Sequence, residues 1–432
     1  MAMSGVRVQD QELLAEGLTL PGFVERSEVI ASLPSLGLLT LAGLTPSYYE
    51  KLYFDLENVQ DKSVLPLDVD LVVISSFTAQ IFEAYELADF YREHQVKVVM
   101  GGLHVTVLPE EALEHCDAVC IGEGELIWPQ VLADFEQGSL KEQYRANGNY
   151  RFENSVMPAY ELLDPSKYNR ITIQTSRGCP HSCEFCAGSI LLTDKYKQKP
   201  ILDVLREIDR ILELWNHPFI ELADDNSFVN KAYWRELLPQ LAQRKIRWFT
   251  EADIAVGEDA GFLELLYESG CKEVLLGLES PVVEGLDKLE LRNNWKLKKQ
   301  WQYKENIRRI QEAGIRVNAC FIVGLDGHDD SIFDAIYEFA KDTCVYDVQV
   351  TLPTPFPGTA FYERLKSEGR LLAEKAWDRC TLFDLLFEPE NFTVRELQVK
   401  FRALVKRIYS QDFTDFRRGS FKQLLKQKRM SH

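Results

Sequence analysis

Three closely spaced cysteines are the residues whose chemistry is easiest to read in this sequence. Cys179, Cys183 and Cys186 are separated by three residues and then by two. The strand-like run Tyr168–Thr175 leads into them, and Gly178 then breaks the strand into a loop. Three thiolates on one short loop can converge on one metal centre. Soft thiolate ligands select zinc, copper(I) or an iron–sulfur cluster.

The number of cysteines distinguishes between these types of metal centre. A structural zinc site has four protein ligands, and an electron-transfer cluster usually has four cysteines. A loop with only three leaves one corner of a [4Fe-4S] cubane open. The loop resembles that of the radical S-adenosylmethionine (SAM) enzymes. The resemblance implies that Cys179, Cys183 and Cys186 bind the cluster, that SAM binds the open iron, and that an aromatic residue, here Phe185, lies against its adenine. The alternatives are a zinc loop that borrows a distant ligand and cysteines that are merely buried.

The first part of the chain alternates strand-like and helix-like segments, and glycine-rich stretches follow two of the strands. Such alternation predicts a parallel sheet with helices on both faces and a ligand beyond the carboxyl ends of its strands. Leu33–Leu38, Gly101–Glu111 and Gly122–Glu125 resemble the cobalamin-binding domain that precedes many radical SAM domains. The resemblance implies a cobalamin site with these contact residues: Gly101, Gly102, His104, Gly122 and Glu123.

Two features depart from the usual pattern of that domain. Its opening strand is weak, because only Phe23–Ile30 stands near the expected place. The Asp-x-His-x-x-Gly motif of another cobalamin class is absent, as it is from many of the radical enzymes. Two alternatives stay open: His104 makes only local hydrogen bonds, and the domain forms a pocket that holds no cobalamin.

A second alternating region begins at residue 168 and contains about six strands. It resembles the partial (β/α)6 barrel of radical SAM enzymes, in which the chemistry lies at the carboxyl ends of the strands. Glu251 and Glu279 end neighbouring strands, and the resemblance makes both candidates for the ribose or methionyl amine of SAM. The alternative is an ion pair with a loop residue such as Arg292 or Lys296. Asp224–Asn226 ends another strand and is expected either at this mouth or as a helix cap.

The predicted fold class is α/β, with a Rossmann-like parallel sheet of cobalamin-binding type, a partial (β/α)6 radical SAM barrel and a helical C-terminal tail. The predicted boundaries are 1–145 for the first domain, 146–167 for a linker, 168–360 for the barrel and 361–432 for the tail. Gly, Asn and Pro mark turns and irregular chain in the linker.

Composition narrows the class of protein. The 432 residues carry a formal net charge of −18, which argues against general nucleic-acid binding through a basic face. No run of about 18 apolar residues predicts a membrane span, and no signal peptide is found, so a cytoplasmic protein is expected. Nine cysteines without a secretion signal indicate reduced thiols. Cys120 and Cys320, which lie in apolar runs, are interpreted as small core residues.

The combined pattern predicts a radical SAM enzyme that cleaves SAM to a 5′-deoxyadenosyl radical. The cobalamin-binding-like domain implies methylation or rearrangement of a small-molecule or natural-product substrate, with an external electron donor such as flavodoxin or ferredoxin. The sequence assigns neither the substrate nor a catalytic residue. A methylthiotransferase for RNA or protein is one alternative, although Cys116 and Cys120 are too few extra ligands and the net charge is acidic. A non-catalytic iron–sulfur protein is the other.

Overall fold

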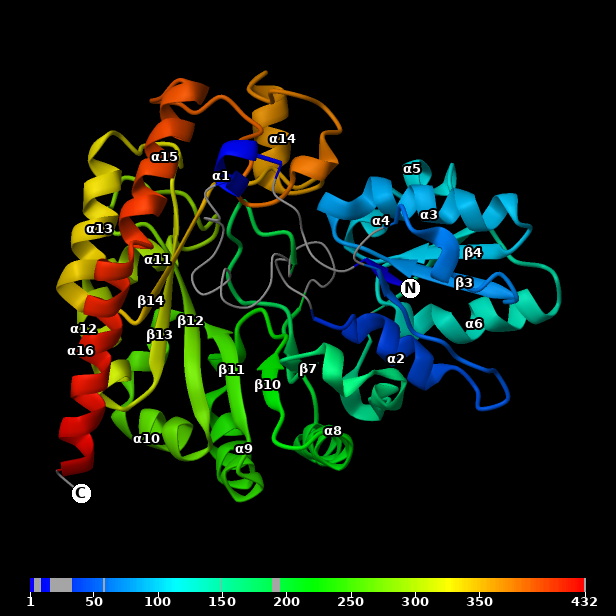
Figure 1. Cartoon of the computed structure of the whole chain (residues 1–432), viewed down its shortest axis with the longest axis horizontal. Coiled ribbons are helices and arrows are strands. Elements are labelled where there is room, and N and C mark those ends of the chain that lie inside the picture. The colour runs from blue at the N-terminus through cyan, green and yellow to red at the C-terminus, as the bar shows by residue number, and fades with distance from the viewer. Residues whose placement is uncertain (4–8, 16–32, 57–58, 149, 189–194, 431–432) are drawn as a thin grey trace.

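Two parallel sheets lie side by side in the computed structural model, the first at the right of Figure 1 and the second at the left. The structure describes residues 1–3, 9–15, 33–56, 59–148, 150–188 and 195–430. Helices of the C-terminal region run along the outer side of the second sheet (Figure 1). This arrangement confirms the predicted α/β fold with two parallel sheets and a helical C-terminus.

The first sheet has six parallel strands in the order β2-β1-β3-β4-β5-β6. The strands are β1 (Ala2–Met3), β2 (Asp55–Leu56), β3 (Leu71–Ser75), β4 (Lys97–Gly101), β5 (Ala118–Ile121) and β6 (Gln143–Arg145). Buried apolar residues make up most of β4 and β5, as expected for strands covered on both faces. The chain places β2 on one side of β1 and β3 to β6 on the other, so the strand order reverses between β1 and β3. In open parallel sheets, ligands bind beyond the carboxyl ends of the strands at such a reversal.

Helices cover both faces of the first sheet, as Figure 1 shows. One face carries α3 (Ile81–Glu93), α4 (Leu103–Val107) and α5 (Pro109–Leu113), and the other carries α2 (Leu36–Leu44) and α6 (Gly124–Glu136). Each face has its own apolar core, with Tyr91 of α3 in one and Trp128 of α6 in the other. The glycine-rich ends of β4 and β5 are therefore fixed between two packed layers.

The opening strand of the first sheet comes from a segment that the sequence does not single out. Ala2 of β1 pairs with Asp55 of β2 on one side and with Ser75 of β3 on the other. The segment Phe23–Ile30, expected near this place, lies outside the described residues. A strand of two residues is too short to show the period-2 alternation from which strands are predicted.

The second sheet is a partial barrel of six parallel strands in the order β14-β13-β12-β11-β10-β7, which follows the chain. The strands are β7 (Ile171–Ile173), β10 (Phe219–Leu222), β11 (Arg247–Ala252), β12 (Cys271–Glu279), β13 (Arg316–Ile322) and β14 (Asp347–Thr351). The helices between them are α8 (Ile201–Leu214), α9 (Lys231–Arg244), α10 (Ala260–Glu268), α11 (Trp295–Lys299), α12 (Tyr303–Glu312) and α13 (Ser331–Thr343). All the strands run the same way, so their carboxyl ends share one edge.

The two faces of the second sheet differ in polarity. On the outer face, Trp248 of β11 stacks on Trp234 of α9 with ring centroids 5.8 Å apart. On the inner face, β10, β11 and β12 present Glu221, Glu251 and Glu273. Glu221 and Glu273 both pair with Phe249 of β11, and Glu251 lies two residues further along that strand. Side chains alternate between faces along each strand, so one sequence pattern builds both the apolar packing and a polar barrel interior.

The C-terminal region contacts both sheets. Its helices are α14 (Ala360–Ser367), α15 (Val394–Ile408) and α16 (Gln411–Met430). The segment between α14 and α15 is largely irregular, and Trp377, Cys380 and Leu386 from it join the apolar core of the first sheet. The indole Nε1 of Trp377 donates a hydrogen bond to Glu111 at 3.0 Å. This non-helical bridge interrupts a region that the sequence predicts to be helical.

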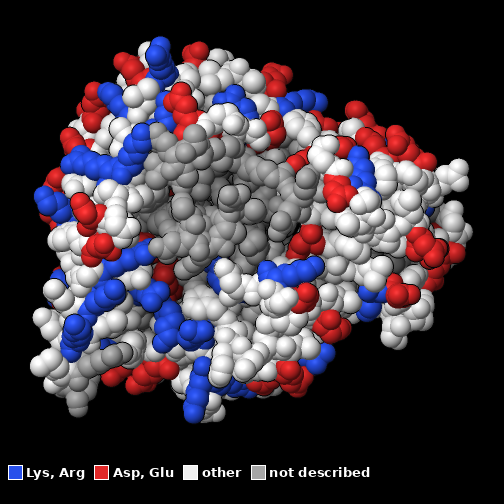
Figure 2. Space-filling model, viewed as in Figure 1, with Lys and Arg blue, Asp and Glu red and all other residues white. Residues whose placement is uncertain are grey.

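The surface carries charges of both signs. Acidic side chains gather over the first sheet, at the right of Figure 2, while Lys and Arg occur mainly over the barrel side of the same face. The mixture is consistent with the net charge of −18. None of the helices in the described ranges combines the length and apolar character that crossing a membrane requires.

Candidate functional site

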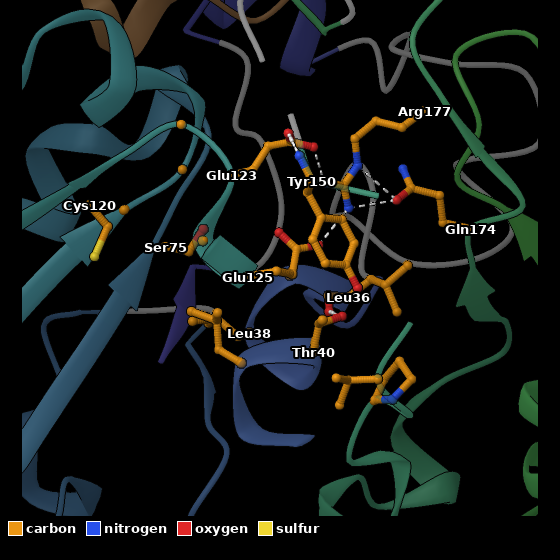
Figure 3. A pocket seen from close by; sticks show the side chains of 18 of the residues that line it. Leu36, Leu38, Thr40, Ser75, Cys120, Glu123, Glu125, Tyr150, Gln174 and Arg177 are labelled. Atoms are coloured by element: carbon orange, nitrogen blue, oxygen red, sulfur yellow. Dashed lines mark hydrogen bonds and ion pairs between the residues drawn. The ribbon is translucent and has the colours of Figure 1, made fainter. Parts of the chain in front are cut away.

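A pocket lies between the two sheets, at the carboxyl ends of strands from both (Figure 3). The first domain contributes Ser75, Gly101, Gly102, Cys120, Gly122 and Glu123, and the second contributes Gln174, Arg177, Lys199 and Ala223. Four residues predicted to contact cobalamin, Gly101, Gly102, Gly122 and Glu123, thus line one pocket. Cys120 is buried as expected and also forms part of its wall.

Because glycine has no side chain, backbone atoms form the surface of this pocket at its glycines. Gly102 and Gly122 have φ values of +105° and +89°, in the left-handed region that glycine tolerates. A Cβ atom on Gly102 would lie 3.0 Å from the hydroxyl oxygen of Ser75, and one on Gly122 would lie 3.2 Å from the side chain of Ala146. Larger residues would therefore strain the backbone and narrow the space in which a ligand could approach the strand ends.

Glu123 is held by cations from the other domain. Arg177 donates a hydrogen bond to its carboxylate at 2.8 Å, and Lys197 does so at 2.6 Å. The backbone amide of Tyr150 donates a third at 2.8 Å. Figure 3 shows Glu123 and Arg177 facing each other at the rim of the pocket. The Glu123 carboxylate therefore links the first domain to the barrel.

His104 lies outside the residues that line the pocket. Its ring is buried, its Nε2 lies 3.4 Å from a carboxylate oxygen of Glu111, and it meets Trp377 edge to face at 5.4 Å. Burial lowers the pKa of His104, which favours the neutral ring at physiological pH. The contact with Glu111 is the local hydrogen bonding that the sequence leaves open as an alternative for this histidine.

The cysteine loop, residues 178–188, starts directly after the first strand of a short antiparallel pair. β8 (Ser176–Arg177) pairs with β9 (Lys197–Gln198). The buried carboxylate of Asp224 accepts hydrogen bonds from the backbone amides of Thr175 and Ser176 at 2.7 and 2.9 Å. Asp225 accepts one from the amide of Gly178 at 2.7 Å. Asp224 and Asp225 are therefore not helix caps here, because their carboxylates fix the strand that leads to the first cysteine.

Two further carboxylates anchor the loop from its other side. Glu290 accepts a hydrogen bond from the amide of Ser182 at 3.1 Å. Glu184, which lies between the second and third cysteines, receives two hydrogen bonds from Arg364 of α14, at 2.7 and 3.1 Å. A two-point arginine–carboxylate contact fixes orientation as well as distance. The loop is thus held by protein contacts on both sides of the cysteines.

The three thiols form a donor set of the kind that binds an iron–sulfur cluster. Burial raises the pKa of Cys179 to about 11 and of Cys183 to about 12, and nearby thiols contribute to both shifts. Within the described part of the chain, no three His, Cys, Asp or Glu side chains lie close enough to hold one metal ion. In a [4Fe-4S] cluster each cysteine binds a different iron, so the sulfurs need not converge on one atom. Metal binding would release the thiol protons.

Phe185 precedes the third cysteine and packs, partly buried, against the apolar core of the barrel. His181, in the same loop, lies against Trp295 with its ring tilted and the ring centroids 4.4 Å apart. Asn226 donates a hydrogen bond to Asp253 at 2.9 Å and lies 3.9 Å from the sulfur of Cys179. The first cysteine therefore has a neutral hydrogen-bond donor beside it.

Glu279 ends β12 in a strained conformation. Its φ of +63° is in the left-handed region, and the pairing of β12 with β13 shifts register just before it. Lys296 of α11 donates hydrogen bonds at 2.6 Å to the Glu279 carboxylate and to the Gly277 carbonyl. A Cβ on Gly277 would lie 2.7 Å from that carboxylate. The ion pair that the sequence leaves open as an alternative for Glu279 is therefore present, and Gly277 makes room for it.

Burial alone would lower the pKa of Lys296, but the Glu279 carboxylate, together with Cys183 and Tyr303, more than offsets this and raises it. The ammonium group also favours the ionised thiols of Cys179 and Cys183. Lys296 therefore carries a buried positive charge that acts on both the strand-end carboxylate and the cysteine loop.

Glu251 is the second-last residue of β11, and its side chain is accessible to solvent although it lies deep among protein atoms. Desolvation and the carboxylates of Glu221, Asp225 and Glu279 raise the pKa of Glu251 to about 8. Cys320 of β13 is only partly buried. Desolvation and the charges of Glu279 and Glu251 raise the pKa of its thiol. The interpretation of Cys320 as a core residue is therefore wrong. Its strand is apolar on one face only, and Cys320 belongs to the other.

Glu251→Gln is expected to stabilise the metal-free protein more as pH rises. In the unfolded chain Glu251 ionises near 4.5, whereas in the folded chain it keeps its proton to about 8. Between these values the folded state binds the extra proton, so the wild type loses stability as pH rises. Allowing for solvent screening, we expect Gln to gain about 1–2 kcal/mol above pH 8 and almost nothing near pH 4.5. Urea unfolding across this pH range measures the difference, and a gain that does not vary with pH would contradict it.

Comparison with known families agrees with this geometry. Residues 173–340 match the Radical SAM superfamily, and residues 34–132 match the B12 binding domain. The first match begins at the end of β7 and includes the three cysteines, and the second contains the glycine-rich ends of β4 and β5.

Several relatives are methyltransferases by name. An uncharacterized methyltransferase of Synechocystis sp. is 31% identical over 79% of this chain, which spans 64% of that relative's length. Bacteriochlorophyllide d C-12(1)-methyltransferase of Chlorobaculum tepidum is 28% identical over 87% of this chain and 82% of its own. Hopanoid C-2 methylase of Rhodopseudomonas palustris is 26% identical over 80% of this chain and 66% of its own.

Two solved structures share the fold. The radical SAM methyltransferase TsrM of Kitasatospora setae, solved with cobalamin and a [4Fe-4S] cluster bound, has a TM-score of 0.67, 14% identity, and coverage of 93% of this chain and 97% of its own. The cobalamin-dependent radical SAM enzyme OxsB has a TM-score of 0.60, 17% identity, and coverage of 87% and 59%. The chain therefore contains a domain of the Radical SAM superfamily, preceded by a B12 binding domain.

Proposed function

We propose that this protein is a cobalamin-dependent radical SAM methyltransferase acting on a small organic substrate. One observation carries the proposal: a single pocket is lined by the strand ends of the B12-binding domain and by Arg177, which stands two residues before the first cysteine. A corrin in this pocket and SAM at the cysteine loop would lie on neighbouring surfaces. Methyl transfer that uses both cofactors requires such proximity.

Each part of the site has a role in this proposal. When bound, the cluster supplies the electron that cleaves SAM, and cobalamin carries the methyl group. Cys179, Cys183 and Cys186 would hold the cluster, with Phe185 against the adenine of SAM. The strand-end carboxylates Glu251 and Glu279 would orient the SAM ribose and amine. The corrin would contact the exposed backbone of Gly101, Gly102 and Gly122.

The finer points of the proposal concern partners and location. An external one-electron donor such as flavodoxin or ferredoxin would reduce the cluster, and we propose a cytoplasmic location. For the substrate, relatives named for bacteriochlorophyllide and hopanoid methylation favour a largely apolar, polycyclic molecule. The carboxylates on the inner face of the barrel, Glu221, Glu251 and Glu273, support an acceptor with at least one polar group near the reacting carbon.

Isotope labelling tests the proposed reaction. The protein would be purified without oxygen, reconstituted with iron, sulfide and hydroxocobalamin, reduced, and supplied with SAM whose methyl group is deuterated. Extracts of cells that lack the protein would serve as the substrate source. We expect both 5′-deoxyadenosine and S-adenosylhomocysteine, and a metabolite that carries the deuterated methyl group. Formation of 5′-deoxyadenosine alone would instead indicate rearrangement or ring closure. Absence of both SAM products would overturn the proposed function.

A further inference from the structure

The strand pair next to the cysteine loop places two positive side chains opposite each other. Arg177 of β8 and Lys197 of β9 are direct partners in the antiparallel register. Like charges in this position repel and weaken a strand pair. The three cysteines lie between these two strands in the sequence, so the pair forms the neck from which the cysteine loop emerges.

Carboxylates of the other domain compensate this repulsion. Glu123 lies 2.8 Å from Arg177 and 2.6 Å from Lys197, so one carboxylate contacts both cations. Glu125 contacts the second terminal nitrogen of Arg177 at 2.8 Å. The four side chains are between 5% and 19% exposed, so the charges lie in a largely buried site in which the remaining contact with water still screens them in part.

The position of Arg177 is fixed from several directions. Its guanidinium also donates hydrogen bonds to Gln174 and lies over the rings of Tyr150 and Phe152, 5.8 and 5.2 Å from their centroids. The next residue, Gly178, is fixed by Asp225. Movement of the Glu123 carboxylate would therefore be transmitted through Arg177 to the chain that enters the first cysteine.

The same carboxylate is part of the wall of the pocket. Glu123, Glu125 and Arg177 all line it, as Figure 3 shows. A ligand that fills the pocket displaces water from beside these groups, which strengthens the attraction between them. Occupation of the pocket thereby tightens the neck of the cysteine loop. No additional contact between the two ligands is needed.

We propose that Glu123 and Glu125, through Arg177 and Lys197, couple the cobalamin pocket to the SAM site, so that cobalamin strengthens SAM binding. This inference rests on the proposed function. It makes Glu123 a positioning residue for the cysteine loop, in addition to its place in the pocket wall. By thermodynamic linkage, SAM must strengthen cobalamin binding by the same factor.

The coupling can be measured without turnover. SAM titrations followed by calorimetry would use the reconstituted protein with its cluster oxidised, a state in which SAM binds without being cleaved, with and without hydroxocobalamin. In the wild type we expect the dissociation constant for SAM to fall by about five-fold or more when cobalamin is bound. In the double variant Glu123→Gln/Glu125→Gln, which keeps the shape of both side chains, we expect the ratio of the two dissociation constants for SAM, without and with cobalamin, to approach one. Lys197→Gln, which removes the opposing cation instead, is expected to reduce the ratio as well.

A matched control separates coupling from general loss of stability. Asp347→Asn removes a partly buried carboxylate that contacts Arg418 at 3.1 Å, at the opposite end of the barrel strands. This variant is expected to keep the wild-type ratio. Equal SAM affinity with and without cobalamin in the wild type, or an unchanged ratio in the Glu123/Glu125 variant, would overturn the inference while leaving the proposed function intact. Failure of the wild type to bind cobalamin or a cluster would overturn both.

Discussion

Replacing Lys296 with methionine is expected to lower the free energy of unfolding by about 3–5 kcal/mol, because it leaves a buried carboxylate without its partner. Lys296 lies 2.6 Å from Glu279, and both side chains are at most 10% exposed. Methionine preserves the length of the side chain and removes the charge. Urea unfolding of the metal-free protein near neutral pH measures the effect.

The double variant Glu279→Gln/Lys296→Met is the control for this prediction. It removes both charges, so we expect it to recover more than half of the stability lost in the single variant. The recovery would show that the single variant loses stability through an unpaired charge. If the double variant were less stable than Lys296→Met alone, the ion pair would not explain the effect.

Replacing Cys179, Cys183 and Cys186 together with alanine is expected to abolish cluster binding and SAM cleavage while leaving the fold intact. The loop is fixed by contacts that need no metal: Glu290 with Ser182, and Arg364 with Glu184. We therefore expect the metal-free variant to unfold within about 1 kcal/mol of the metal-free wild type. Iron and sulfide analysis after reconstitution, together with urea unfolding, measures both parts.

Cys271→Ala provides the matched control for the triple variant. Cys271 is fully buried at the start of β12, remote in sequence from the cysteine loop. We expect this variant to bind as much iron as the wild type, although it loses some packing. Retention of a SAM-responsive cluster by the triple variant would show that other residues bind the iron.

The longer strands of the fold could be predicted from the sequence because their residue patterns are local. Strands such as β5, β10 and β14 are short runs bounded by turn residues, and the barrel has about the number of strands that the sequence predicts. Their inward and outward faces follow from the period of two. β1 escaped prediction because two residues carry no periodicity. The irregular bridge around Trp377 escaped because its conformation depends on packing against another domain.

Only part of the candidate site could be predicted from the sequence. The cysteine spacing and the glycine-rich stretches are local signals, visible without a structure. The partners of Glu123 and Glu279 are not local, because Arg177 is 54 residues from Glu123 and Lys296 lies on a separate helix. The outcome for Asp224 shows the same limit. A carboxylate after a strand is a plausible helix cap, and only the fold reveals that it binds the chain before the cysteines instead.

The central claim is that three cysteines hold a [4Fe-4S] cluster whose remaining iron is free to bind SAM. Electron–nuclear double resonance on the reduced, reconstituted protein tests it most directly, with SAM labelled by ¹⁵N at the methionyl amine and ¹⁷O at the carboxylate. We predict hyperfine coupling from both labels to the cluster. Absence of coupling from either label, in protein that contains a complete cubane, would mean that another side chain occupies the fourth iron and would contradict the claim.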